Sequence, residues 1–401
     1  MQRDIDHDFS AVSRACRIHS GTGALDRIGD ELKRAGVQRA LVITGRSVAE
    51  GTGLLPRIET AAGGRVAGVF AAMRKDTPLE DVQAAVARAR ELGADGLIAL
   101  GGGSVVQGAR VTAILLAENG APEALATQYP EDGPAISPRL MAPKLPILTA
   151  LTIGTTAQDR GGSPVKGAER RLEFFDPKTR PAALFWDREA LATAPEGMLR
   201  ATAAMLYWRA TMDMGYGRAS VLADLNRREV FALADRIRRA LSDGDAGDAV
   251  RADLCVATWL QNRAADDGAR PVETWTSRVT YAFSTELFHR HGEVAQGAAV
   301  SALGPNVLRE LGARDPVAMD GIADALGLRV RQAEALPEML ADRMRADLGA
   351  LGMAETLTTL GVPQDSAAPM LERALKNFNA DPKREFMAER DRLAEVMAAC
   401  W

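Results

Sequence analysis

The strongest constraint in this chain is a run of three glycines and a serine, Gly101-Gly102-Gly103-Ser104. It directly follows the apolar stretch 96–100, which is predicted to be a buried parallel strand. After the run, Ser104 is predicted to cap a helix that ends near Asn119 and Gly120. The apolar residues at helical spacing in this stretch are Val105, Val106, Ala109, Val111 and Ile114. The chain is therefore expected to pass from a strand through a tight glycine turn into a helix.

A turn of this kind is suited to a phosphate group. Glycines let the backbone approach the anion closely, and the free N–H groups and dipole of the helix supply positive potential. The turn is neither the G-x-G-x-x-G fingerprint nor a P-loop, since no Gly-Lys-Ser/Thr follows it. The alternative is a tight turn without a ligand, but three consecutive glycines cost conformational entropy that an ordinary turn avoids. The sequence therefore favours a phosphate site.

Composition excludes several classes of protein. A chain of 401 residues is long enough for two domains, each with its own core. A formal net charge of -4, with 25% charged residues, gives no indication of nucleic-acid binding. No apolar run approaches the roughly 18 residues of a membrane span, and the first residues hold no apolar signal segment. We therefore expect a cytoplasmic protein that binds neither nucleic acid nor membrane.

Cysteines and histidines are too few and too scattered for an ordinary metal site. Cys16, Cys255 and Cys400 lie far apart, so reduced structural thiols are expected. The chain has four histidines, two near the N-terminus and two in one short motif: His7, His19, His289 and His291. A site built from three histidines would therefore need ligands from opposite ends of the chain.

From residue 20 to about 190, predicted strands alternate with predicted helices. The expected helices are 25–35, 79–91 and the one after the glycine run, and the expected strands are 40–44, 68–70, 96–100 and 146–150. This alternation indicates a parallel sheet with right-handed crossovers and helices on both faces. Ligands bind at the carboxyl ends of such strands, where the polar turns after the strands would gather.

Past Pro195 the strand signals fade. The long amphipathic segments are 198–211, 218–241, 249–265 and 297–311. We therefore predict an α/β domain at 1–190 and an all-α domain at 191–401. The proline-rich stretch 121–142 is expected to be an irregular excursion from the first domain.

The order of these features resembles the iron-containing alcohol dehydrogenase family, which includes the maleylacetate reductases. Glycerol dehydrogenase and dehydroquinate synthase are more distant relatives. The resemblance rests on four segments: Gly21-Thr22-Gly23-Ala24-Leu25, 99–106, Thr152-Ile153-Gly154-Thr155-Thr156 and His291-Gly292-Glu293. The most specific element is the combination of the glycine unit with His-Gly-Glu nearly two hundred residues later. The likeness extends from about residue 17 to the C-terminus.

The resemblance implies a fold and a cofactor. The fold is a Rossmann-like N-terminal dinucleotide-binding domain with a parallel sheet, followed by an all-α helical domain, with catalysis in the cleft between them. The cofactor is NAD(P). Its expected binding residues in the two turns are Gly101, Gly102, Gly103, Ser104, Thr152 and Thr155. A small-molecule substrate and a homodimer are also expected.

This sequence departs from the family at the helix after the glycine run. There the family usually carries an aspartate and then a lysine, but this chain has Gln107 and Arg110. The phosphate turn is retained, while an acidic group that faces the cofactor has become neutral.

A larger departure concerns the metal site. Family members bind a divalent cation through one aspartate and three histidines, the first two ligands lying four residues apart on a helix. Aligning the leucine of 201–209 puts Ala204 and Trp208 at these positions, and a shift of one puts Met205 and Arg209 there. No histidine occurs within 276–284, where the third ligand should lie, so only His291 remains. A rescued site from Asp213, Glu286, His289, His291 and Glu293 would need His289 and His291 to converge, although residues two apart diverge on a helix. No catalytic metal is expected.

Without a metal, other groups must stabilise the alkoxide that develops during hydride transfer to a carbonyl. His291 is the expected proton or hydrogen-bond donor, with His289 beside it. Arg209 and Arg278 would supply positive charge, and a guanidinium suits a carboxylate, so the substrate is expected to be acidic. Trp208 and Trp275 are the expected walls of the substrate site. The alternative is that these arginines lie on the solvated surface.

One position bears on the choice of cofactor. NAD-preferring relatives often carry an aspartate after the strand 40–44, where this chain has Gly45, followed by Arg46. Loss of the acid removes repulsion toward a 2′-phosphate, and Arg46 could pair with it. The sequence therefore leans toward NADP, although Arg46 could equally be an exposed turn residue.

Three functions remain open from the sequence. The leading one is a metal-independent NAD(P)-dependent reductase or dehydrogenase, similar to maleylacetate reductase. The second is a cofactor- or ligand-binding homologue that has lost redox chemistry. The third is a redox-neutral enzyme on the same fold.

Overall fold

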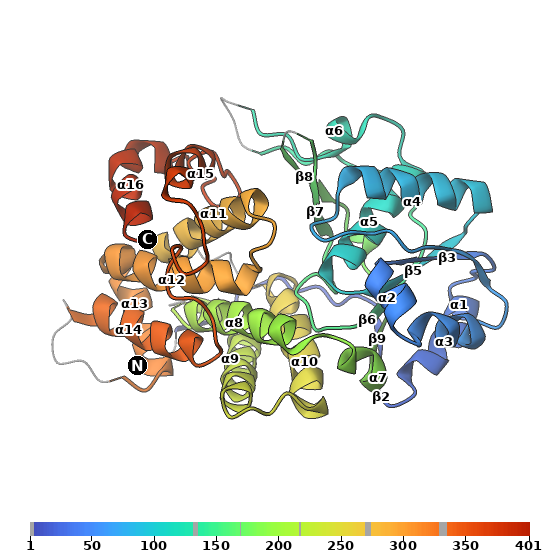
Figure 1. The fold of residues 1–401 in the computed structure, drawn as a ribbon, viewed down its shortest axis with the longest axis horizontal. Helices are drawn as coiled ribbons and strands as arrows, with labels where there is room; N and C mark the ends of the chain where they lie inside the picture. Colours follow the sequence, from blue (N-terminus) through green and yellow to red (C-terminus); the bar gives the residue numbers. More distant parts are fainter. Residues whose placement is uncertain (1–3, 131–134, 169, 216–217, 269–273, 329–334) are drawn as a thin grey trace. The chain divides into compact units, whose positions relative to one another are not determined.

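The fold comes from a computed structural model, which describes residues 4–130, 135–168, 170–215, 218–268, 274–328 and 335–401. The chain divides into two compact units (Figure 1). One holds 14–195 together with 247–262, and the other holds 1–13, 196–246 and 263–401. This division differs from the predicted one in three places: the first residues join the helical unit, the main boundary follows 195 instead of 190, and 247–262 join the α/β unit.

The α/β unit is built on six parallel strands in the order β2-β9-β6-β5-β3-β4. The strands are β2 (Arg17–Gly21), β3 (Ala40–Thr44), β4 (Val66–Phe70), β5 (Gly96–Gly101), β6 (Ile147–Leu151) and β9 (Ala183–Asp187). The predicted parallel sheet is confirmed. The sequence pattern did not reveal β2 and β9, nor the antiparallel hairpin β7 (Gly162–Lys166) and β8 (Arg171–Phe175).

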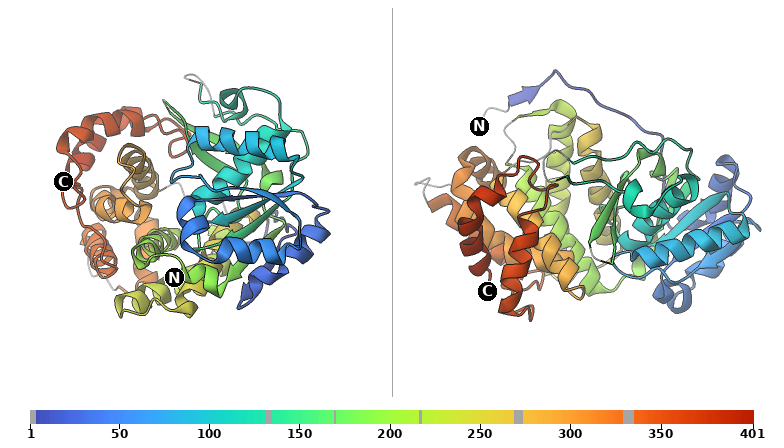
Figure 2. Two further views of the ribbon diagram at one scale, coloured as in Figure 1. Left: turned by 45° about the vertical axis from the view of Figure 1, so that its right-hand side comes forward. Right: turned by 90° about the horizontal axis from the view of Figure 1, so that it is seen from above.

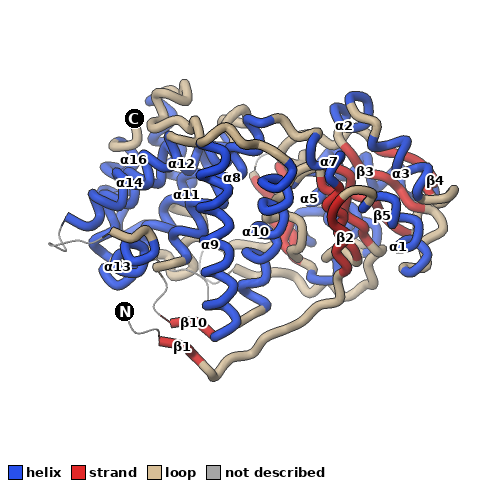
Figure 3. Tube along the Cα trace, turned by 90° about the horizontal axis from the view of Figure 1, so that it is seen from below, coloured by secondary structure: helices blue, strands red, loops and turns tan. Residues whose placement is uncertain are grey.

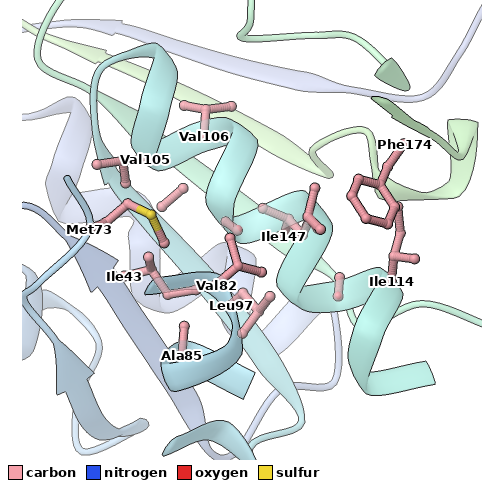
Figure 4. Packing of buried hydrophobic residues seen from close by; sticks show 14 of the residues in the cluster. Ile43, Met73, Val82, Ala85, Leu97, Val105, Val106, Ile114, Ile147 and Phe174 are labelled. Carbon is pink, nitrogen blue, oxygen red and sulfur yellow. The ribbon is translucent and has the colours of Figure 1, made fainter. Parts of the chain in front are cut away.

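Helices cover both faces of this sheet, as predicted. In β3 the side chains alternate, so that Leu41 and Ile43 join one core cluster while Ala40 and Val42 join the other. The first cluster packs under α4 (Leu79–Leu92) and α5 (Gly103–Ala117), as Figure 4 shows in part. The second packs under η1 (Ala24–Arg27), α1 (Ile28–Arg34), α3 (Leu54–Ala61) and α7 (Arg188–Ala192). Strands buried on both faces read as the continuous apolar runs seen in the sequence.

The shorter elements of this unit lie in its connections. They are α2 (Arg46–Gly51), α6 (Pro122–Leu125) and η2 (Pro177–Thr179). The N-terminal part of α10 (Asp248–Asp266) also belongs here, because the side chain of Arg251 donates to the backbone oxygens of Leu191 and Ala194.

The second unit is mainly helical (Figure 2). Its principal helices are α8 (Glu196–Asp213), α9 (Val221–Ser242), α11 (Trp275–Arg290), α12 (Gln296–Leu311), α13 (Pro316–Ala325), α14 (Leu336–Gly349), α15 (Ala367–Ala374) and α16 (Arg390–Ala398). Short η3 (Gly312–Arg314), η5 (Gln364–Ser366) and η6 (Phe386–Glu389) connect some of them. Helix α12 contacts α8, α11 and α14, so it lies at the centre of this core.

The helical unit also contains one small parallel sheet. Strand β1 (Asp4–Asp6) pairs with β10 (Arg218–Ser220), which leads directly into α9 (Figure 3). The backbone N–H of Val12 donates to the Asp266 oxygen, which ties the segment after β1 to the end of α10.

Candidate functional site

The glycine run forms the junction between β5 and α5. Gly101 ends the strand with a φ of +154°, and a side chain there would lie 2.8 Å from the Val105 side chain. Gly102 is the N-cap and α5 begins at Gly103, with no side-chain cap. The prediction that Ser104 caps the helix is wrong, because its hydroxyl accepts a hydrogen bond from the Asp76 backbone N–H instead (3.0 Å). The first N–H groups of α5 have no acceptor within the helix and stay available to an anion.

The threonine-rich turn lies against this junction. The Thr152 N–H donates to the Gly101 oxygen at 3.2 Å. A β-carbon on Gly102 would lie 3.3 Å from the Ile153 side chain, and one on Gly103 would lie 3.1 Å from the Thr155 hydroxyl. The structure thus brings the two predicted turns together, at the carboxyl ends of β5 and β6. Gly102 and Gly103 keep the space between the two turns free of side chains.

The residue that anchors the threonine-rich turn has no signature in the local sequence. Gln158 is buried and donates from Nε2 to the Cys255 oxygen (2.9 Å) and the Thr258 hydroxyl (2.8 Å), both on α10. Its Oε1 accepts a bond from the Trp186 indole at 2.9 Å. Gly154 lets this helix approach, since a β-carbon there would lie 2.7 Å from the Cys255 nitrogen. These contacts join positions about one hundred residues apart, which no local pattern reveals.

Arg110 anchors the hairpin next to α5. Its guanidinium is buried and donates from Nη1 to the Gly162 oxygen at 2.9 Å, with the Ser163 hydroxyl at 3.3 Å. Burial, together with the charge of Arg160, lowers the pKa of Arg110 to about 9. Arg110 therefore connects the phosphate-turn helix to β7.

Gly45 and Arg46 lie at the carboxyl end of β3. Gly45 is the N-cap of α2, and a β-carbon there would lie 3.2 Å from the Met73 oxygen. Arg46 begins the helix, is 78% exposed and lies 3.9 Å from the Glu50 carboxylate. An exposed arginine in so loose an ion pair is free to meet another anion.

In the helical unit, the two positions expected for metal ligands are packed into the core. Ala204 and Trp208 lie one turn apart on α8 and are both buried. The Trp208 indole fills the space beside α12, so that a β-carbon on Gly304 would lie 2.6 Å from its ring. Trp208 therefore packs against a helix, rather than forming the open wall predicted for a substrate site.

The residues present do not fit the divalent cation that the family's name implies. An alanine and a tryptophan offer no metal ligand, and α11 has no histidine before His289. Within the described ranges, no group of three or more histidine, cysteine, aspartate or glutamate side chains is arranged to hold a metal ion.

His291 lies directly after α11 and is held on two sides. Its Nε2 is 3.2 Å from the Ser366 hydroxyl, and its Nδ1 is 3.6 Å from the Glu293 carboxylate. His289 lies in the last turn of α11 and is half-buried. The contacts with Ser366 and Glu293 orient the imidazole. The His291 side chain is 16% exposed.

Arg278 and Trp275 belong to a closed cluster. The buried Arg278 guanidinium donates to the Ala380 oxygen (2.9 Å), the Glu385 carboxylate (2.6 Å) and the buried Asp381 carboxylate. It also lies 5.1 Å from the Trp275 ring centre, and Arg314 lies 4.5 Å from the same ring. This differs from the expected role, because the donors of Arg278 face acceptors of the protein rather than open space.

Arg209 has different surroundings. It is half-buried on α8 and makes no hydrogen bond or ion pair with any residue that the structure describes. Of the two arginines predicted to meet a substrate carboxylate, Arg209 is the one with donors available.

Comparison with known proteins now adds to this geometry. A sequence profile described as iron-containing alcohol dehydrogenase matches residues 15–188. These residues belong to the iron-containing alcohol dehydrogenase family. The predicted resemblance is confirmed for this part of the chain.

Relatives extend the likeness along the chain. A 4-hydroxybutyrate dehydrogenase of Cupriavidus necator is 31% identical over 185 residues, 46% of this chain and 47% of the relative. The match thus spans about half the length of that enzyme. A maleylacetate reductase of Burkholderia cepacia is 24% identical over 385 residues, 94% of this chain and 93% of the relative.

A solved structure bears out the predicted fold. That of NADH-dependent butanol dehydrogenase A from Thermotoga maritima superposes with a TM-score of 0.80 and covers 100% of both chains at 18% identity. The Rossmann-like sheet and the helical C-terminal part are both of the iron-containing alcohol dehydrogenase type. None of the described helices combines the length and the apolar character needed to cross a membrane.

Proposed function

We propose that this protein is a metal-independent, NAD(P)-dependent reductase or dehydrogenase. It acts on a carbonyl or alcohol of a small acidic substrate, in the manner of the maleylacetate reductases. The observation that carries the proposal is the pair of turns at the carboxyl ends of β5 and β6, where Gly102 and Gly103 leave space free beside the start of α5. Family membership of this region supports the same reading.

The residues of the two turns fit the pyrophosphate of a dinucleotide. The N–H groups of Gly103 and Ser104 point from the start of α5, where the helix dipole favours an anion. The Thr155 hydroxyl accepts the Ala157 N–H at 3.1 Å, so its own proton remains for a phosphate oxygen. The bound nicotinamide supplies or accepts the hydride. Arg46, exposed at the end of β3, supports the preference for NADP.

In the helical unit, His291 is the proposed acid and base. Ser366 holds the ring through Nε2, and the proton passes from Nδ1, which lies 3.6 Å from Glu293 and makes no hydrogen bond to it, to the substrate oxygen as that oxygen gains negative charge. Arg209 is the proposed partner of the substrate carboxylate, because its guanidinium makes no bond to the described residues. His289, close in sequence, is a secondary candidate for proton transfer. The homodimer and the cytoplasmic location stay predictions.

Replacing His291 tests this assignment. We expect His291→Ala to lower turnover by roughly 100-fold, as loss of an acid catalyst usually does, with cofactor affinity unchanged. His291→Gln should be equally slow, since an amide bonds to Ser366 but transfers no proton. His7→Ala, in the N-terminal segment, is the control and should retain full activity. Normal turnover in His291→Ala would reduce the histidine to a structural contact.

Metal analysis tests whether the enzyme is independent of metal. We expect protein purified without chelators to contain far less than one iron or zinc per chain, because Ala204 and Trp208 occupy the ligand positions. Chelators should leave turnover unchanged, and added iron or zinc should not raise it. Stoichiometric metal together with chelator-sensitive turnover would contradict metal independence.

A second candidate is a dinucleotide-binding homologue without redox chemistry. The packing of Trp208 against Gly304 favours it, since one position aligned with a ligand of the family's cation is filled by a core side chain. Absorbance of reduced nicotinamide, followed with a panel of keto acids and aldehydes, separates the two candidates. Cofactor binding without turnover on any of them would favour the second.

A further inference from the structure

A strained segment lies next to the phosphate turn. Asp76 has a φ of +62° and Thr77 a φ of +54°, a region that side-chain-bearing residues rarely adopt. Thr77 is also β-branched and fully buried, which makes the conformation especially unfavourable. The surrounding structure must therefore hold these two residues in place.

Both residues contact Ser104. The Asp76 backbone N–H donates to the Ser104 hydroxyl at 3.0 Å, and the Thr77 hydroxyl donates to the Ser104 backbone oxygen at 2.9 Å. The Thr77 hydroxyl also lies 3.4 Å from Oε1 of Gln107, one turn further along α5. Because the Ser104 hydroxyl accepts from Asp76, its own proton is directed elsewhere and is available to an anion.

The segment is fixed on both sides. The Thr77 oxygen accepts the Lys166 N–H of β7 at 3.1 Å. On the other side, the Met73 side chain points into the core beside Val105 (Figure 4). Gly108 makes room for it, since a β-carbon there would lie 2.5 Å from the Met73 methyl group. Strand β7 and helix α5 therefore both restrain the conformation of Asp76 and Thr77.

We propose that Thr77, together with the Asp76 backbone, positions the phosphate turn for the dinucleotide. This inference rests on the proposed function, since it assigns a role around the same turn. Thr77 fixes the first turn of α5 through the Ser104 carbonyl, while the Asp76 N–H orients the Ser104 hydroxyl as a donor to the pyrophosphate. The strained backbone directs both donors, the Asp76 N–H and the Thr77 hydroxyl, to Ser104. The half-buried Asp76 carboxyl group, whose pKa is raised by burial, lies on the same segment.

The test removes the hydrogen bond from the Thr77 hydroxyl to the Ser104 oxygen without changing the shape of the side chain. Thr77→Val keeps the β-branched outline and lacks the donor, and we expect the Kd for NADPH or NADH to rise roughly fivefold to tenfold. At saturating cofactor, kcat should stay within about twofold of the wild type, so the effect appears in KM for the cofactor. Thr77→Ser restores a hydroxyl and should restore affinity.

Thr179→Val is the matched control. The buried Thr179 hydroxyl also donates to a backbone oxygen, that of Asp176 at 2.7 Å, in the same unit. Thr179→Val should lower Tm as Thr77→Val does, but its affinity for the cofactor should equal that of the wild type. If Thr77→Val binds the cofactor as tightly as the wild type, the positioning role is overturned. The same holds if Thr77→Val and Thr179→Val weaken cofactor binding equally. Gly102→Val separates the positioning role of Thr77 from the proposed cofactor site. If Gly102→Val loses cofactor affinity while Thr77→Val binds normally, the positioning role fails and the cofactor site at the glycine turn stands. A wild-type chain that binds neither cofactor overturns both.

Discussion

Gly102→Val is expected to weaken binding of NADPH or NADH by roughly 100-fold, because a branched side chain would fill the space nearest the pyrophosphate. The backbone at Gly102, with φ -91° and ψ -163°, is one that valine adopts without strain. Its β-carbon would lie 3.3 Å from the Ile153 side chain, a contact that a small shift of that side chain relieves. We therefore expect a folded protein that has lost its cofactor. Titration of protein fluorescence with the dinucleotide measures the affinity.

Gly53→Val provides the control for this substitution. Gly53 lies in the same unit with a φ of -80°, and a β-carbon there meets nothing within 4 Å. It should bind the cofactor as the wild type does. Unchanged affinity in a folded Gly102→Val protein would remove the glycine turn from the cofactor site.

Arg278→Ala is expected to destabilise the protein by about 3–5 kcal/mol, as loss of one partner of a buried ion pair does. The substitution leaves the Asp381 carboxylate buried, with the Phe386 N–H (2.7 Å) as a remaining donor. It also removes the guanidinium that packs against the rings of both Trp275 and Phe386. Urea unfolding followed by circular dichroism measures the loss.

Two comparisons make this result specific. Arg239→Ala removes an ion pair to Asp235 on the same unit, but Arg239 is 67% exposed, so a loss of at most about 1 kcal/mol is expected. In the double variant Arg278→Ala/Asp381→Ala, the loss should be smaller than the sum of the single losses, because no charge is left unpaired. A stable Arg278→Ala protein with a raised KM for an acidic substrate would instead support the substrate-binding role expected from the sequence.

Local patterns were sufficient for the central strands of the α/β unit. Strands buried on both faces carry continuous apolar runs, so β3, β5 and β6 could be predicted from residues close in sequence. The meeting of the glycine and threonine turns also followed from the sequence, because the carboxyl ends of parallel strands lie at one edge of the sheet. Strands β2 and β9 escaped prediction, since their pairing with each other and with β6 depends on residues far apart.

The N-cap of α5 at the glycine turn could not be predicted from neighbouring residues alone. Serine at the start of a helix usually caps it, so the sequence favoured that role for Ser104. The helix begins two residues earlier than a Ser104 cap would place it, with Gly102 as the N-cap, and the Ser104 hydroxyl accepts from the backbone of Asp76. The partner lies 28 residues away, and its positive φ has no signature in the sequence.

The sequence by itself determined which side chains stand at the positions aligned with the family's metal ligands, because residue type and spacing are properties of the sequence alone. It also determined the glycine turn between a strand and a helix, since glycine content and strand–helix order are local. Only the tertiary structure decided which charged groups are available for chemistry. Arg278 and Arg209 look alike in sequence, yet one meets Asp381 about one hundred residues away and the other meets no described partner. Long-range packing decides this difference, because the burial of a charge and the approach of its counter-charge both depend on segments that only folding brings together.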